Sequence, residues 1–384
     1  AYSAEPADSC YPEIICPDSN RLGGNVAALE PLFQKLEALE KKDTTAVISI
    51  LQIGDSHIQA GFFPNEVREN LQREFGNAGR GLIVPLKLAG TNEPPDYAIT
   101  SPNSWNRSNC MSIVTYDRHI ELDIKTKEPF DRIWAFHHRE APLLTVPDSL
   151  SDGICCPALD NDEMTLIPLS RPVEQIRLCA SVADSSFAHS AFYGFSLENG
   201  RSGVLYHSFG INGNTYAAIN RNPQIVRQAS GLCPDLVIVS LGTNDSYGAS
   251  FDPADADVQI TRLIDSIRRN MPASVLLLTT PMEHCRRIRS KGRTYRKPNP
   301  NACAMRECIL RQAALYRLPV WDFYAAAGGD GAMGRWADLG IANADRVHLS
   351  REGYRLQGKL FYDAIMKAYD HYRKHNGELK ILLN

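Results

Sequence analysis

The sequence lacks several features that would point to common functions. No apolar run approaches the ~20 residues that a membrane span needs. The formal net charge is only −3, so overall charge indicates neither a nucleic-acid partner nor an anionic membrane. Cys-x-x-Cys, a Walker loop, His-Glu-x-x-His and a dinucleotide fingerprint are all missing. We therefore expect no membrane span, no nucleic-acid partner, no metal and no cofactor.

Length and cysteine content bound the class of protein. The 384 residues, 43% of them hydrophobic, can form a large core and exceed the usual size of one domain. The ten cysteines could pair in an oxidising compartment, although buried free thiols are also common in large domains. The sequence starts at Ala1 without a basic-then-apolar leader, which fits a mature exported protein as well as a trimmed one. We expect export, to the periplasm or the extracellular space.

Apolar runs alternate with helical stretches in two parts of the chain. The run at 46–53 shows little alternation of polar and apolar residues, as expected for a strand covered on both faces. Further runs lie at 204–209, 236–241, 275–280 and 318–321. Helices are predicted near 29–39, 64–75, 214–229, 254–270, 301–316 and 350–374. The alternation predicts an α/β domain with a mostly parallel sheet and helices on both faces.

The alternation breaks between about 96 and 195. Short β-type runs separated by Pro, Asp and Asn take its place, at 112–116, 119–124, 132–137, 164–167, 176–180 and 191–197. A loop of ~100 residues is improbable in a compact domain. We therefore predict an all-β subdomain at 96–195, inserted into an α/β domain of residues 25–95 and 196–384. Residues 1–24, rich in Pro, Ser, Asp and Asn, are expected to be an extended lead-in.

Four short polar blocks follow or precede these predicted elements. Gly54-Asp55-Ser56-His57, Gly210-Ile211-Asn212-Gly213 and Gly242-Thr243-Asn244-Asp245 each follow an apolar run, and Asp345-Arg346-Val347-His348 precedes the last helix. Ligand sites of open α/β sheets gather at the carboxyl ends of the strands. We expect the blocks to meet there.

Together the blocks supply the parts of a serine esterase. Ser56 is the candidate nucleophile, and its hydroxyl needs a base such as His348 to take its proton. Asp345 can accept a hydrogen bond from the other ring nitrogen of His348 and so fix the tautomer. The backbone N–H groups of Ser56 and Gly213 and the side-chain amide of Asn244 can donate to the oxyanion. Gly-x-Ser-x-Gly is absent, so the nucleophile elbow of α/β-hydrolases does not apply.

The blocks resemble the SGNH hydrolases, also called GDSL hydrolases, which are named after a Ser, a Gly, an Asn and a His. The matching positions are Ser56, Gly213, Asn244 and His348, and Asp345 matches the Asp that supports the His. The resemblance covers roughly 44–95 and 200–375. It implies a flavodoxin-like three-layer sandwich and metal-free ester hydrolysis through an acyl-serine intermediate. His57 departs from the Leu of Gly-Asp-Ser-Leu.

A narrower resemblance is to the peptidoglycan O-acetylesterases. It is carried by Gly-Asp-Ser-His, by the segment Phe75-Gly-Asn-Ala-Gly-Arg-Gly-Leu-Ile-Val-Pro85, by the β-rich insertion, and by Gly334, Trp336 and Leu339. This resemblance implies an O-acetylated glycan substrate, most specifically cell-wall peptidoglycan, and a carbohydrate-binding-like insertion. Two alternatives stay open: an esterase acting on another acetylated polysaccharide or on lipid esters, and a non-catalytic glycan-binding protein. Lipid chemistry would predict an apolar channel beside Ser56.

Two further features have competing interpretations. The segment 286–297 holds seven Arg and Lys residues. It could attract an anionic polymer such as a carboxylate-bearing glycan, or it could be a solvated flexible loop. His57, next to the candidate nucleophile, could contact substrate or make a structural hydrogen bond. The sequence does not indicate the oligomeric state.

Overall fold

The computed structural model describes residues 11, 13–42, 45–108, 112–153, 155–158, 161–183 and 187–382. Its main sheet has the strand order β1-β16-β13-β12-β2-β11. The bounds are β1 Leu22–Gly24, β16 Pro319–Trp321, β13 Val275–Thr279, β12 Leu236–Ser240, β2 Val47–Gly54 and β11 Gly203–Gly210. All neighbours pair in parallel except β1, which is antiparallel to β16. The predicted α/β class with a mostly parallel sheet is therefore confirmed.

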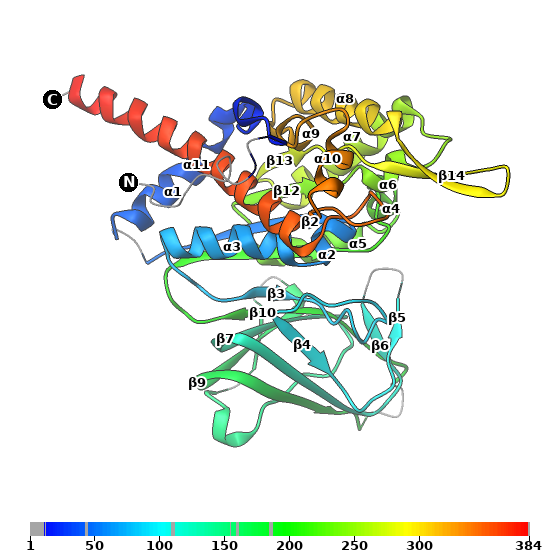
Figure 1. Cartoon of the computed structure of the whole chain (residues 1–384). Helices are drawn as coiled ribbons and strands as arrows, with labels where there is room; N and C mark the ends of the chain where they lie inside the picture. The colour runs from blue at the N-terminus through cyan, green and yellow to red at the C-terminus, as the bar shows by residue number, and fades with distance from the viewer. Residues whose placement is uncertain are drawn as a thin grey trace.

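Helices cover both faces of this sheet (Figure 1). One face carries α1 Glu30–Glu40, α3 Phe62–Phe75 and α11 Arg351–Leu382, and the other carries α7 Pro253–Asn270 and α8 Pro300–Leu315. Along β2, Ile48 and Ile50 belong to the first core, whereas Leu51 and Ile53 belong to the second. Apart from Ser49, Gln52 and Gly54, the strand is apolar because successive side chains enter different cores.

Short helices and turns complete the α/β part. They are α2 Ser56–Gln59, α4 Tyr216–Asn220, α5 Gln224–Ala229, α6 Thr243–Tyr247, α9 Phe323–Ala326, α10 Ala332–Asp338 and the 3-10 turns η2 Pro17–Ser19, η3 Val26–Leu29 and η5 Ser230–Leu232; the 3-10 turn η4 Asp148–Leu150 lies outside this part, between β7 and β8 of the second sheet. The single helix predicted over 214–229 is wrong, since α4 and α5 are separate. Pro223 precedes α5; it has no N–H to donate and disfavours helical conformation in Asn222.

The predicted lead-in is more structured than expected. In the described part of 1–24, Ile14 and Ile15 are buried in the first core. Leu22 to Gly24 then form β1 on the edge of the main sheet. The composition of this segment suggested weak structure, but two adjacent isoleucines and the open edge of β16 favour docking.

A second sheet lies between β2 and β11 in the sequence. Among the described residues it contains β3 Gly81–Ile83, β4 Tyr97–Thr100, β5 Asn106–Arg107, β6 Ile113–Thr115, β7 His119–His137, β8 Cys156–Ala158, β9 Asn161–Ser181 and β10 Ser190–Glu198. All its pairings are antiparallel. Figure 1 shows β3 and β10 as its strands nearest the α/β part. β3 precedes the predicted subdomain start at 96, yet it pairs with β10.

Two predicted pairs of short strands each form one long strand. The runs at 119–124 and 132–137 both lie in β7, and those at 164–167 and 176–180 both lie in β9. The pairing of β7 with β9 changes register between Lys125 and Arg132. A β-bulge of this kind interrupts the alternation of side chains without ending the strand. The polar residues between the runs therefore suggested turns that the structure does not contain.

A buried ion cluster joins α3 to the start of the second sheet. Asp96 contacts Arg68 at 3.2 Å and Arg80 at 2.6 Å, and both arginine side chains are nearly inaccessible to solvent. Glu128 of β7 lies 3.3 Å from Arg68. Burial by itself would raise the pKa of Asp96, but the two arginines lower it well below its usual value. Asp96 is thus charged and compensates two buried cations.

Asp96→Asn is expected to lower the free energy of unfolding by about 3–5 kcal/mol, because buried Arg80 loses its ion-pair partner and buried Arg68 keeps only Glu128. In the wild type the depressed pKa of Asp96 stabilises the fold at pH values above about 3.8, the pKa of the unfolded state. This stabilisation is lost as the pH falls toward the folded-state pKa. The variant should therefore lose less stability in acid than the wild type. Urea unfolding at neutral and acidic pH tests this, with the exposed substitution Asp152→Asn as the control. Equal stability of the two variants at neutral pH would refute it.

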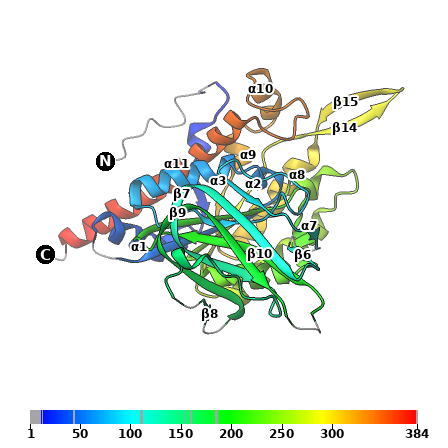
Figure 2. The same cartoon turned by 90° about the horizontal axis from the view of Figure 1, so that it is seen from below.

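The cationic segment forms a hairpin of β14 Cys285–Ser290 and β15 Arg293–Pro298. Lys291 and Gly292, at its turn, both have positive φ angles, of 48° and 74°. Two such residues match the twist of paired strands, which explains why the segment is not the irregular loop considered above. Figures 1 and 2 show that the hairpin projects away from the rest of the molecule.

The cysteines and the described helices concern two expectations from the sequence, which are export to an oxidising compartment and the lack of a membrane span. Free thiols are carried by Cys16, Cys155, Cys179, Cys233, Cys285, Cys303 and Cys308. Cys10 and Cys110 lie outside the described residues. Among the described helices, none combines the length and the apolar character needed to cross a bilayer.

Candidate active site

Ser56 lies where β2 turns into the short helix α2. β2 ends at Gly54, and Ser56 is the first residue of α2. A side chain at Gly54 would place its Cβ 2.2 Å from Ile58 Cγ1 and 2.8 Å from the carbonyl oxygen of Ser240. Only glycine therefore allows this turn to pack. Asp55 caps α2 by accepting a hydrogen bond from the His57 N–H at 3.0 Å.

Ser56, His348 and Asp345 are brought together in line. Ser56 Oγ lies 2.9 Å from His348 Nε2, and His348 Nδ1 lies 2.7 Å from Asp345 Oδ2. Because the carboxylate accepts the Nδ1–H, Nε2 is left to accept the proton of the serine hydroxyl. The two segments are 292 residues apart in sequence, and the carboxyl edge of the sheet joins them.

The turn that holds His348 is fixed by its own backbone. Asp345 Oδ1 accepts hydrogen bonds from the N–H groups of Val347 and His348, at 2.9 and 3.0 Å. Arg346 has a φ of 54°, which is unusual for a residue with a side chain. Partial burial raises the pKa of Asp345, but the hydrogen bonds from His348 and Val347 outweigh it, and the net pKa is lowered. The carboxylate therefore stays charged at neutral pH.

Gly213 and Asn244 line the same pocket as Ser56 and His348, a space of about 530 Å³. Gly213 follows β11 and Asn244 lies in α6, directly after β12. Gly213 has a φ of 78°, and a Cβ there would meet no atom within 4 Å. The glycine at this position is therefore required by the left-handed backbone and not by a lack of space for a side chain.

Asn244 is held loosely on one side. Its Nδ2 donates to the carbonyl oxygen of Asn214 at 3.0 Å and lies 3.4 Å from Asp55 Oδ2. Burial raises the pKa of Asp55 to about 7. The hydrogen bond from the His57 N–H opposes this rise, and the charge of Asp245 adds to it. Asp55 thus carries only part of a negative charge near neutral pH. One N–H of Asn244 is therefore weakly bound and can turn to another acceptor.

His57 lies behind the triad. Its ring stacks on that of His348 with centroids 5.3 Å apart, and its Nδ1 lies 3.0 Å from the Tyr354 hydroxyl. It lines an interior cavity and is not among the residues that line the pocket of Ser56. Burial and the neighbouring His348 lower the pKa of His57 to about 3, so it is neutral. This placement favours the structural interpretation of His57 over substrate contact.

A loop that the sequence gave no reason to single out forms one wall of the site. Gln59, buried in α2, donates to Thr91 Oγ1 and to the Asn92 carbonyl, both at 2.9 Å. Its Oε1 accepts from the Asn212 N–H at 2.6 Å. Asn212 in turn donates to Asn92 Oδ1 at 2.8 Å. The loop between β3 and β4 is thereby tied to the block that contains Gly213, and no local motif indicates this pairing.

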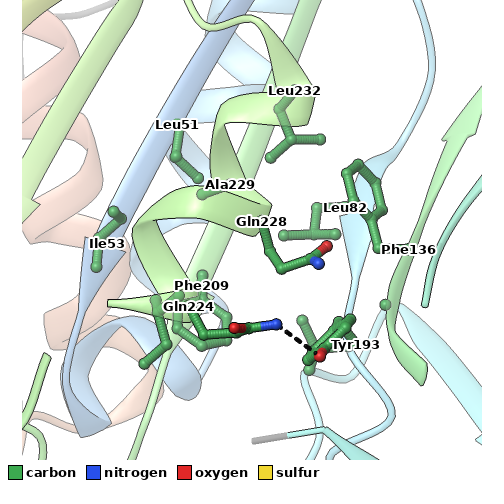
Figure 3. A pocket seen from close by; sticks show the side chains of 13 residues that line it. Leu51, Ile53, Leu82, Phe136, Tyr193, Phe209, Gln224, Gln228, Ala229 and Leu232 are labelled. Atoms are coloured by element: carbon green, nitrogen blue, oxygen red, sulfur yellow. Dashed lines mark hydrogen bonds between the residues drawn. The ribbon is translucent and has the colours of Figure 1, made fainter. Parts of the chain in front are cut away.

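Most of the residues around Ser56 have polar side chains. The pocket is also lined by Asn92, Asn212, Asn343, Ser350, Arg351 and Tyr354, with Ala60, Phe62 and Leu349 as its apolar members. A markedly apolar pocket exists elsewhere, between α5 and the second sheet, where Leu51, Leu82, Phe136 and Leu232 converge (Figure 3). Gln224 there donates to the Tyr193 hydroxyl at 2.9 Å. Neither Ser56 nor His348 lines this second pocket.

The residues that the structure describes contain no group of three or more His, Cys, Asp or Glu arranged to hold a metal ion.

Comparison with known proteins gives a family for part of the chain. Residues 184–356 match the model of the GDSL-like lipase/acylhydrolase family. This stretch includes Gly213, Asn244, Asp345 and His348 but not Ser56. Ser56 joins them because β2 pairs with β11 and β12 in the sheet. A search of curated proteins gave no match.

Solved structures give the fold. The chain is similar to a peptidoglycan O-acetylesterase, with a TM-score of 0.73 at 20% identity, over 91% of this chain and 99% of that one. An Enterococcus faecalis lipase/acylhydrolase (TM-score 0.32, 23% identity, 43% of this chain, 76% of that one) and an acetyl xylan esterase (0.34, 18%, 43%, 81%) also match.

The contact between Ser56 and His348 at 2.9 Å and the open pocket beside it argue against a non-catalytic glycan-binding protein. The match over residues 184–356, taken with the contacts among Ser56, His348 and Asp345, makes the chain a carboxylic ester hydrolase that carries a GDSL-like lipase/acylhydrolase domain in that stretch.

Proposed function

We propose that this protein is a serine esterase that removes O-acetyl groups from a glycan, most specifically cell-wall peptidoglycan. The observation that carries the proposal is the Ser56–His348–Asp345 chain of contacts, at 2.9 and 2.7 Å, opening onto a pocket whose lining residues mostly have polar side chains. A short acetyl group needs no long apolar channel, whereas sugar hydroxyls need hydrogen-bond partners. The apolar pocket lies away from Ser56, which argues against lipid esters as substrates.

The reaction takes two steps. Ser56 Oγ attacks the acetyl carbonyl carbon while His348 Nε2 takes the hydroxyl proton, and the ester C–O bond then breaks as His348 protonates the departing sugar oxygen. Water, deprotonated by the same imidazole, next attacks the acetyl-serine and releases acetate. The oxyanion of each tetrahedral intermediate is held by the N–H groups of Ser56 and Gly213 and by Asn244. Neutral His57 packs behind His348 and takes no proton.

The remaining expectations follow from this substrate. The similarity in fold to a peptidoglycan O-acetylesterase supports the choice of glycan. Cell-wall glycans lie outside the cytoplasm, so we propose that the protein acts in the periplasm or the extracellular space. We also propose that residues 96–195, with their antiparallel strands, are an inserted carbohydrate-binding-like subdomain.

A panel of acetylated substrates tests the function. O-acetylated peptidoglycan, acetylated xylan and aryl esters with acyl chains of increasing length are offered to the wild type, and acetate or aryl alcohol is measured. The highest kcat/KM is expected on acetylated peptidoglycan, with a steep decline beyond acetyl among the aryl esters. A preference for xylan would move the substrate to another polysaccharide. A preference for long acyl chains would contradict glycan deacetylation.

Asn244→Ala is expected to lower kcat on an aryl acetate by about 10²–10³-fold, equivalent to losing roughly 2.7–4 kcal/mol of oxyanion stabilisation. KM should change little, because the donor acts mainly on the charge that develops in the transition state. Steady-state kinetics check this beside Asn270→Ala, an exposed substitution on α7. A kcat close to that of the wild type would remove Asn244 from the oxyanion hole.

A further inference from the structure

The β14–β15 hairpin carries an unusual concentration of positive charge. Seven of the chain's 41 Arg and Lys residues lie in the twelve positions 286–297, and no Asp or Glu lies among them. Since the whole chain has a net charge of −3, the rest of it has a net charge of −10. The cations are Arg286, Arg287, Arg289, Lys291, Arg293, Arg296 and Lys297.

These charges are not neutralised by the protein. Within the described part of the chain, none of the ion pairs involves a residue of 286–297. Arg286 is half-buried and the other six are exposed. In the strand register, Arg287 faces Arg296 and Arg286 faces Lys297. Like charges placed opposite one another are destabilising, so the hairpin holds its cations together at a cost in stability.

The base of the hairpin is attached to the segments that carry the site. The Cys285 N–H donates to the carbonyl oxygen of Arg346 at 2.8 Å, two residues before His348. The Arg287 N–H donates to the hydroxyl of Tyr247 at 3.4 Å, and Tyr247 ends the helix α6 that contains Asn244. The hairpin follows β13 and so starts at the same carboxyl edge of the sheet as Ser56. A polymer bound in the pocket can therefore continue along it.

We propose that the β14–β15 hairpin is a binding arm for the anionic part of the substrate, a glycan that bears carboxylates. This inference rests on the proposed function, because it assigns hairpin and pocket to one polymer. Arg and Lys attract carboxylates over distances set by the ionic strength, and a cationic arm beside a site raises the rate of encounter. Single-stranded nucleic acid is a poorer fit, since it needs several stacking platforms. The hairpin has one exposed aromatic residue, Tyr295.

The test removes charge from the tip, away from the base. The variant is Arg289→Gln/Lys291→Asn/Arg293→Gln, in which Asn tolerates the positive φ of position 291. The control Arg262→Gln/Arg269→Gln/Lys374→Gln makes the same change of charge at exposed positions on α7 and α11. Both are assayed on O-acetylated peptidoglycan and on a neutral aryl acetate, at low and high salt.

At low salt the tip variant is expected to lose about tenfold in kcat/KM on peptidoglycan, within the range that steering supplies. The loss should shrink toward none at about 0.5 M salt. The aryl acetate should be cleaved as by the wild type. An equal loss on the aryl acetate, an equal loss in the control variant, or no loss on peptidoglycan would overturn the proposal.

A binding measurement separates this inference from the proposed function. Ser56→Ala, with and without the tip substitutions, is sedimented with peptidoglycan from which the acetyl groups have been removed. Sedimentation that requires the tip cations and weakens with salt supports the arm even if the wild type releases no acetate. Equal sedimentation of both proteins overturns it. The proposal is also overturned if duplex DNA, or a vesicle of anionic lipid, displaces the protein from peptidoglycan at a lower concentration than soluble peptidoglycan fragments do.

Discussion

Replacing Ser56 by alanine is expected to lower kcat on an aryl acetate by on the order of 10⁶-fold, the loss seen when a serine hydrolase is deprived of its nucleophile. No acyl-enzyme can form without the hydroxyl, and His348 alone can only assist water. The oxyanion donors should leave some acceleration over the uncatalysed reaction, roughly 10³–10⁴-fold. Stopped assays at high enzyme concentration measure this remaining activity.

The fold should survive this substitution. Among the described residues, the hydrogen-bond partner of Ser56 Oγ is His348, and the cap of α2 is provided by Asp55. Circular dichroism and the urea midpoint should match those of the wild type and of Ser250→Ala, an exposed serine substitution. A well-folded Ser56→Ala protein that still cleaves the ester within about tenfold of the wild type would exclude Ser56 as the nucleophile.

Asp345→Asn is expected to lower kcat by about 10⁴-fold, as when the equivalent carboxylate of a serine protease is replaced by its amide. The side-chain amide of an asparagine can donate to Nδ1, which places the imidazole proton on Nε2. Nε2 can then no longer accept the proton of the serine hydroxyl. The imidazolium formed during attack also loses its counter-charge. Kinetics beside Asp338→Asn, an exposed substitution at the end of α10, separate this effect from a general change of charge.

The pH dependence gives an independent check on Asp345. The pKa of Asp345 is depressed in the folded state. Its contribution to the stability of the fold is therefore present above the pKa of the unfolded state and is lost only as pH falls through the folded-state pKa. Asp345 should therefore stay a carboxylate, and keep orienting the imidazole, at least down to the ordinary aspartate value near 3.8. A carboxyl signal of Asp345 that titrates above this value by NMR would contradict the assignment.

The sequence predicted the site better than its surroundings. Glycine-containing blocks after apolar runs marked the strand ends, and parallel strands bring their carboxyl ends to one edge whatever their order along the chain. Ser56 and His348 could thus be paired without a structure. Their separation of 292 positions in sequence did not matter, because β2 pairs in parallel with β12 and β11 and ends at the edge of the sheet where His348 lies.

Other features depend on contacts that no local pattern encodes. The wall formed by Asn92 is fixed by Gln59, a buried side chain more than 30 positions away. The burial of His57 against Tyr354 depends on where α11 packs. The long strands β7 and β9 were divided in prediction because the change of register near Phe130 interrupts the alternation. In each case the deciding interaction is tertiary.

Covalent labelling tests the central claim, that Ser56 is the nucleophile of an esterase. The wild type is treated with a sulfonyl fluoride, which transfers its sulfonyl group to an activated serine oxygen with loss of fluoride. The protein is then digested and mapped by mass spectrometry, while acetate release from O-acetylated peptidoglycan is followed in the same sample. We predict the label on Ser56, a loss of esterase activity in proportion to labelling, and far slower labelling of Asp345→Asn. Label on another residue when activity is lost, or full activity in protein labelled at Ser56, would contradict the account.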